Sequence, residues 1–205
     1  MQKNRYLDKN VENIGFLDIE TKTDSFKASS GYMMSWVLKK WNLVTNKKEI
    51  IEGWVDSEIL TDKKRRKKLD MDKEILPPLV SAMKECDLIV THYGTWFDIP
   101  FIRTRCEMMK IPFIEHSDKI RFADTWKLAK LQGSYKSNSL DFVAKTLGCP
   151  YVKTIVDYSE WELFNVFGER KSGKYILKHN EIDVDVTEWV WKKLEKYAPI
   201  SARYY

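Results

Sequence analysis

Two acidic residues at the end of one predicted strand constrain the fold of this chain more than any other sequence feature. They are Asp18 and Glu20, in the run Ile14-Gly15-Phe16-Leu17-Asp18-Ile19-Glu20-Thr21. Side chains alternate faces along an extended strand, so these two acids point one way while Leu17 and Ile19 face the other. Adjacent carboxylates raise each other's pKa unless a cation lies between them, which favours a hard divalent metal. The alternative is a strand end that runs into a polar turn.

A third acid follows a second predicted strand. The chain reads Leu88-Ile89-Val90-Thr91-His92-Tyr93-Gly94-Thr95-Trp96-Phe97-Asp98-Ile99-Pro100. Gly94 breaks the apolar run, and Pro100 fits the first turn of a helix. These signals predict strand, turn and helix, with Asp98 at the start of the helix. Taken alone, Asp98 fits an N-cap that has no other role.

The fourth acid lies in a predicted helix over residues 175–190. Apolar residues recur there at intervals of three, four or six, as a helix requires: Ile176, Ile182, Val186, Trp189 and Val190. His179 and Asp183 are four positions apart and therefore share one helix face. Asp185 points away from that face and is expected to be a solvated surface acid.

The three ordered segments resemble the motifs of the DEDD exonucleases in the DnaQ-like, ribonuclease H-like superfamily. Phe16-Leu-Asp-Ile-Glu-Thr21 resembles the first motif, and Phe97-Asp98-Ile99-Pro100, preceded by His-Tyr-Gly, resembles the second. His179-Asn-Glu-Ile-Asp183-Val resembles the third. Segments 124–129 and 139–148 are similar to connecting helices of predicted stand-alone exonucleases, so the resemblance runs from about residue 14 to residue 197.

The chain departs from the family pattern at two positions. Family members often have asparagine where this chain has Tyr93. The third motif usually has either a histidine with four residues before the aspartate or a tyrosine with three. Here His179 stands at the tyrosine spacing from Asp183, and the histidine-type spacing would require a carboxylate at Val184.

The resemblance implies a metal-dependent 3′–5′ exonuclease that releases nucleoside monophosphates from nucleic-acid 3′ ends. Oxygen ligands suit two Mg²⁺ or Mn²⁺ ions, which stabilise the attacking and departing oxygens. The expected ligands are Asp18, Glu20, Asp98 and Asp183. His179 would orient or deprotonate the attacking water, because an imidazole with a pKa near 6.5 accepts a proton at neutral pH. The expected substrate contacts are Thr21, Trp96 and Phe97, with Trp96 stacking on a terminal base unless it only packs at the rim.

Two other functions compete with this one. A ribonuclease H-like endonuclease would use similar carboxylates, although the ordered second and third motifs favour an exonuclease. A non-catalytic nucleic-acid-binding module is disfavoured, because four retained acids would cost stability without a use. The expected partners are single-stranded 3′ ends and a polymerase or a replication or repair protein.

Composition predicts one soluble domain over residues 1–205. No linker rich in Pro, Gly or Ser divides the chain, and the net charge of +5 suits a polyanionic partner. The cationic run Lys63–Lys68 fits phosphate contacts, a localisation signal or a solvated loop. Three cysteines without metal-type spacing favour reduced thiols. With no signal peptide or membrane span in the sequence, we expect a cytoplasmic protein and no membrane partner.

The order of predicted elements indicates an α/β fold. Strands over residues 14–20, 32–43 and 48–55 should form an antiparallel meander. A helix over 73–85, a strand at Leu88, a helix after Asp98 and a strand near 120–122 follow, and helices fill the rest. This order agrees with the ribonuclease H-like three-layer sandwich that the resemblance implies, a mixed five-stranded sheet flanked by helices.

Overall fold

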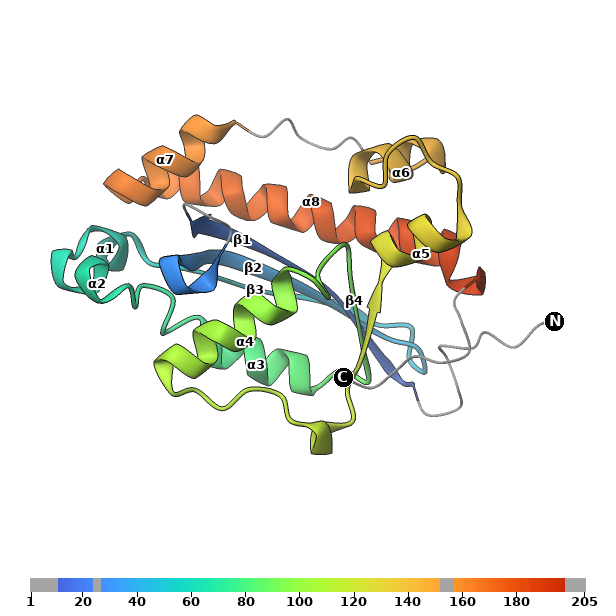
Figure 1. Ribbon diagram of the computed structural model, residues 1–205, viewed down its shortest axis with the longest axis horizontal. Helices are drawn as coiled ribbons and strands as arrows, with labels where there is room; N and C mark the ends of the chain where they lie inside the picture. Colours follow the sequence, from blue (N-terminus) through green and yellow to red (C-terminus); the bar gives the residue numbers. More distant parts are fainter. Residues whose placement is uncertain (1–10, 24–26, 152–156, 198–205) are drawn as a thin grey trace.

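Five strands form one mixed sheet at the centre of the molecule (Figure 1). The computed structural model describes residues 11–23, 27–151 and 157–197. The strands are β1 (Asn13–Thr23), β2 (Gly31–Asn42), β3 (Lys48–Trp54), β4 (Leu88–Thr91) and β5 (Arg121–Asp124). They lie in the order β3-β2-β1-β4-β5; β1 to β3 are antiparallel, and β4 and β5 run parallel to β1. The predicted mixed five-stranded sheet is confirmed.

Helices cover both faces of this sheet (Figure 1). α3 (Leu76–Lys84) and α4 (Asp98–Met109) lie on one face. On the other face α8 (Arg170–Leu194) crosses β1 and β2. Three helices pack against α8: α5 (Thr125–Gln132), α6 (Leu140–Thr146) and α7 (Tyr158–Phe167). The shorter helices are α1 (Ser57–Thr61), α2 (Lys63–Lys68), η1 (Ala28–Ser30), η2 (His116–Asp118) and η3 (Glu195–Tyr197). The layers form the predicted three-layer sandwich. No described helix is both long and apolar enough to cross a bilayer.

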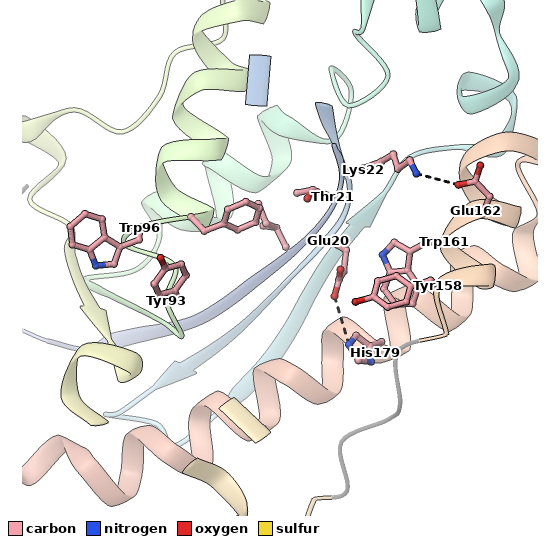
Figure 2. Close-up of a pocket in the computed structure, with 11 residues that line it drawn as sticks. Glu20, Thr21, Lys22, Tyr93, Trp96, Tyr158, Trp161, Glu162 and His179 are labelled. Carbon is pink, nitrogen blue, oxygen red and sulfur yellow. Dashed lines mark hydrogen bonds and ion pairs between the residues drawn. The ribbon is translucent and has the colours of Figure 1, made fainter. Parts of the chain in front are cut away.

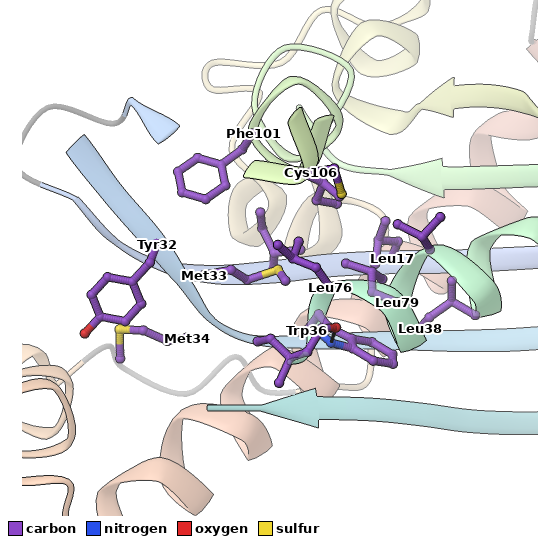
Figure 3. Close-up of a cluster of buried hydrophobic side chains, with 14 of the residues drawn as sticks. Leu17, Tyr32, Met33, Met34, Trp36, Leu38, Leu76, Leu79, Phe101 and Cys106 are labelled. Carbon is purple, nitrogen blue, oxygen red and sulfur yellow. Dashed lines mark hydrogen bonds between the residues drawn. The ribbon is translucent and has the colours of Figure 1, made fainter. Parts of the chain in front are cut away.

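The alternating faces of β1 determine where its acids point. Leu17 and Ile19 are buried in the cluster that includes residues of α3 and α4, part of which Figure 3 shows around Leu76 and Leu79. Phe16 belongs to the cluster on the opposite face, with residues of α8. Because strand side chains alternate, Asp18 and Glu20 share the face of Phe16. Both acids therefore point toward α8, on the face opposite Leu17 and Ile19 that the alternation predicted.

A buried ion pair holds α4 in place beside the sheet. Arg105 of α4 donates from Nε and Nη2 to the two carboxylate oxygens of Asp72, at 2.9 and 2.7 Å, and both side chains are fully buried. The backbone N–H of Met33 in β2 also donates to Asp72. Since Asp98 is the first residue of α4, this network also fixes the position of that acid.

The cationic run differs from the solvated loop that was one of its expected forms. Residues 63–68 form helix α2, whose N-terminus is capped by the side chain of Asp62. Arg65 donates to Glu74 at 2.7 and 2.6 Å, and Arg66 donates to the carbonyl of Asn165 in α7 at 2.6 Å. Two of the six cations are therefore used to anchor the helix, and the four lysines remain exposed.

Candidate active site

The two acids of β1 both meet residues of α8. Asn180 donates from Nδ2 to Asp18 Oδ2 at 2.5 Å, and Glu20 Oε1 lies 4.0 Å from His179 Nε2. Asn180 is fully buried, so its amide is a fixed donor beneath the Asp18 carboxylate. Sequence reasoning missed Asn180, which is adjacent to a motif residue but has no motif signal of its own.

The third-motif residues lie one helical turn apart on the same face of α8. His179 Nε2 is 3.8 Å from Asp183 Oδ2, and the imidazole packs edge to face with Trp161 of α7, with ring centroids 5.6 Å apart. Both residues are buried, whereas Val184 is part of the apolar core. The three-residue spacing therefore brings His179 and Asp183 to the acids of β1, and position 184 faces elsewhere.

Asp98 reaches the same place from the opposite side of the sheet. β4 pairs with β1 only as far as Phe16, and beyond it the backbone N–H of Ile19 donates to Asp98 Oδ1 at 3.2 Å. The N-cap of α4 is Phe97, so the interpretation of Asp98 as a simple N-cap is wrong. Burial raises the pKa of Asp98 from 3.8 to about 7, and the nearby charge of Asp124 adds to the effect.

The loop before Asp98 is held by Asp124, at the junction of β5 and α5. Asp124 Oδ1 accepts from the backbone N–H of Tyr93 at 2.9 Å, and Oδ2 accepts from the backbone N–H and hydroxyl of Thr95 at 3.1 and 2.7 Å. The same carboxylate caps α5 through the N–H of Trp126. Asp124 thus positions the second motif, a role that its sequence position after a short strand did not reveal.

Gly94 lets this loop approach the Asp98 carboxylate closely. A Cβ at position 94 would lie 2.8 Å from Asp98 Oδ2 and 2.5 Å from Thr91 Cβ, both well inside normal contact. Gly94→Ala should therefore displace Asp98 without changing any charge, and we expect about a hundred-fold loss of nuclease turnover. The control is Gly148→Ala, which strains the backbone at a φ of +72° but meets no atom within 4 Å and lies outside the candidate site. Equal turnover in the two variants, measured at saturating metal, would show that the position of Asp98 is unimportant.

One groove opens beside Glu20 and His179 (Figure 2). This first groove has a volume of about 840 Å³ and is lined by Ile19, Glu20, Thr21, Lys22, Tyr93, Trp96, Phe97, Tyr158, Trp161, Glu162 and His179. Thr21, Trp96 and Phe97, the expected substrate contacts, all lie on its wall. Trp96 is 63% exposed, and Lys127 Nζ lies 5.2 Å from the centre of its ring. The opposite wall comes from α7, whose Tyr158 and Trp161 no sequence motif marked.

A second groove begins on the other side of the acids. It has a volume of about 700 Å³ and is lined by Asp18, His92, Tyr93, Trp126, Lys136, Ser137, Asn138, Ser139, Leu140 and Asp183. The ring of His92 is held in the wall of this groove, because its nitrogens lie 2.8 Å from Thr125 Oγ1 and 3.0 Å from the carbonyl of Asn138. Four of the five predicted catalytic residues therefore line two grooves that share Tyr93, and the fifth, Asp98, accepts from the N–H of Ile19 on the wall of the first.

Comparison with known proteins identifies the family. A sequence model of the ribonuclease H superfamily matches residues 15–195. The chain belongs to the ribonuclease H superfamily. Membership supports nuclease activity in general terms. No curated protein matches the chain significantly.

Among solved structures, this superfamily member is similar to a family B DNA polymerase from the hyperthermophilic archaeon Pyrobaculum calidifontis. The TM-score is 0.62 at 17% sequence identity, and the match covers 89% of this chain and 24% of the polymerase. At that identity the likeness supports the ribonuclease H-like fold alone. The matched part spans about a quarter of the polymerase.

The acidic residues of this ribonuclease H-superfamily protein differ in their surroundings. Within the described ranges, no three His, Cys, Asp or Glu side chains are already gathered as a metal-ion site. Asp185, expected to be solvated, instead pairs with Lys39 at 2.5 Å and is only partly exposed, because β2 carries that lysine beneath α8. Asp185 is thus occupied by a structural contact, whereas Asp18, Glu20 and Asp183 line the grooves and Asp98 bonds the backbone of β1.

Proposed function

We propose that the protein is a metal-dependent 3′–5′ exonuclease that hydrolyses single-stranded nucleic acid from its 3′ end. The observation that carries this proposal is the convergence of three separated segments: Asp98 bonds the backbone of β1 between Asp18 and Glu20, and the β1 acids meet α8. Such convergence has no structural need, since a salt-bridged or apolar junction would be more stable.

The donor set fits hard divalent cations. All four proposed ligands are carboxylates, the oxygen donors that Mg²⁺ and Mn²⁺ prefer: Asp18, Glu20, Asp98 and Asp183. When bound, two such ions would activate a water and stabilise the departing 3′ oxygen. Ionised Asp98 is disfavoured by its burial, so a nearby cation would offset that cost.

His179 is the proposed proton acceptor for the attacking water. Its side chain is almost fully buried, and Trp161 holds one side of the ring edge to face. Its Nε2 lies 4.0 Å from Glu20 and 3.8 Å from Asp183, so the nitrogen stands between two acids. An imidazole held this way can take a proton, and the two carboxylates would stabilise the resulting cation.

An ion pair across one end of the first groove favours a chain end over a continuous strand. At one end Lys22 of β1 pairs with Glu162 of α7 at 3.2 Å, which connects the two walls (Figure 2). A strand that continued through the groove would have to displace this pair. We therefore place the terminal nucleotide in the first groove, against Trp96 and Phe97, and the preceding nucleotides in the second.

Circular and linear single strands of equal sequence test the choice between exonuclease and endonuclease. The proposal predicts that, with Mg²⁺ or Mn²⁺, the linear form is degraded and the circle stays intact. Rapid cutting of the circle would support the endonuclease instead. Binding of both without cutting of either would support the non-catalytic module. The polymerase or repair partner stays a prediction.

Lys136 tests the path of the strand. It lines the second groove and is exposed, whereas α2 contacts the distal end of α7 through Asn165, beyond the Lys22–Glu162 pair. Lys136→Gln should reduce the slope of log Kd against log salt by about 0.7 for single strands, the value for one phosphate contact. As the control, glutamine at the four exposed lysines of α2 should change the slope less: Lys63, Lys64, Lys67 and Lys68. The reverse order would place the strand over α2.

A further inference from the structure

Tyr93 has a backbone conformation that tyrosine rarely adopts. Its φ angle is +64°, in the left-handed region, where asparagine and glycine are favoured over bulky residues. The surroundings impose this conformation. The N–H of Tyr93 donates to Asp124, and its carbonyl accepts from the N–H groups of Trp96 and Phe97 at 3.0 and 3.1 Å. A tyrosine held in strained backbone beside a candidate active site points to a use for its ring.

The ring of Tyr93 stands between the two grooves. Tyr93 lines both of them, and Figure 2 shows it on the wall of the first groove that also carries Trp96. Tyr93 is 47% exposed, although its loop is held by hydrogen bonds to Asp124. The boundary between the grooves also holds the acids, since Glu20 lines the first groove and Asp18 lines the second.

Trp126 supports the Tyr93 ring from one side. The two rings meet edge to face, with centroids 5.2 Å apart and an interplanar angle of 71°. An edge-to-face contact covers at most one face of the tyrosine ring, so at least one face is not covered by Trp126. Lys130 Nζ lies 4.7 Å from the centre of the Trp126 ring and helps to hold it. The result is a fixed aromatic platform with an available face.

We infer that Tyr93 stacks on the base next to the terminal one and thereby selects single-stranded ends. This inference rests on the proposed function, because it places the bond to be cut at the acids between the grooves. A base unstacked from its neighbour and from any partner strand can lie on the ring, whereas a base held in a duplex cannot. The tyrosine therefore specifies the substrate class at a position where asparagine would fit the backbone better.

A fluorescent base analogue, 2-aminopurine, tests the stacking directly. It is placed next to the 3′ end, or six positions upstream, in a single-stranded oligonucleotide. Binding is measured in an Asp98→Asn background, so that no cutting occurs. We expect the fluorescence of the analogue next to the 3′ end to be quenched by the parent, which carries Asp98→Asn alone, and also when Tyr93→Phe is added. Tyr93→Asn should lose that quenching and bind roughly 5- to 150-fold more weakly, the range for loss of one base–aromatic stack.

Two measurements separate stacking from a structural role. Tyr93→Asn should not lower the melting temperature, because asparagine relieves the backbone strain. The matched control is Tyr151→Asn, which removes a tyrosine that is also 47% exposed but lines neither groove, and it should leave binding unchanged. If the wild type trims 3′ ends but, in the Asp98→Asn background, Tyr93→Asn binds as tightly as the parent, the stacking inference is wrong and the proposed function stands. If the wild type neither binds nor trims single strands, the proposed function fails first.

Discussion

Asp98→Asn should abolish metal-dependent cleavage, with a loss of at least about a thousand-fold in turnover. The amide retains the size of the carboxylate and can still accept from the N–H of Ile19, so the loop and α4 should stay in place. What is lost is the negative charge that a divalent cation would need at this point. Turnover is measured on 5′-labelled single strands at saturating Mg²⁺ and again at saturating Mn²⁺. Cleavage near the wild-type rate would remove Asp98 from the metal site.

The same variant should be more stable than the wild type when metal is removed by a chelator. Because burial raises the pKa of Asp98 to about 7, the folded protein binds this proton more tightly than the unfolded chain does. The contribution of Asp98 to wild-type stability should therefore fall as the pH rises from about 4 to about 7, and the variant should lack this contribution. Above that window the difference in unfolding free energy should reach about 2 to 4 kcal/mol. Denaturant unfolding at several pH values measures it, and parallel curves for the two proteins would contradict it.

His179→Ala should lower turnover by about a hundred-fold or more, the usual scale for loss of a general base. The reason is geometric, because its Nε2 stands between Glu20 and Asp183 and Trp161 fixes the ring. The wild-type rate should also fall in acid, where the imidazole is protonated and accepts no further proton. Since carboxylates also bind metal more weakly in acid, the profile is recorded at saturating metal.

His179→Tyr is the sharper companion experiment. His179 is separated from Asp183 by three residues, the spacing at which the DEDD exonucleases that this chain resembles have a tyrosine. A tyrosine hydroxyl at this position could orient the water. We expect partial activity, and we expect the fall of the rate in acid to occur at a different pH than in the wild type. If His179→Ala retains near wild-type turnover at saturating metal, the proton-acceptor role is wrong and Asp183 alone carries the third motif.

Local patterns in the sequence were sufficient to predict the faces of the main elements. Alternation along β1 put Asp18 and Glu20 opposite Leu17 and Ile19, and the four-residue interval put His179 and Asp183 together on a helix. Both rules depend only on the geometry of a single strand or helix. They therefore hold wherever the element lies in the fold.

Contacts between distant elements were not predictable in this way. The bond from Asn180 to Asp18 depends on how α8 crosses β1, and the groove wall at Trp161 depends on how α7 docks. The helix over residues 63–68 could not be predicted from local patterns either, because six like charges disfavour a helix. Contacts outside the helix, from Arg65 to Glu74 and from Arg66 to Asn165, stabilise it. These three features depend on tertiary contacts, which the spacing of residues along one strand or helix does not reveal.

The most direct test of the proposed function is the product ladder from a 5′-labelled single-stranded oligonucleotide. DNA and RNA are each offered to the purified protein with Mg²⁺, with Mn²⁺ or with chelator, and products are sampled over time. The account predicts fragments that shorten one nucleotide at a time from the 3′ end, only in the presence of metal, with nucleoside monophosphates released. Shortening that persists in chelator, or immediate release of the labelled 5′ nucleotide, would contradict it.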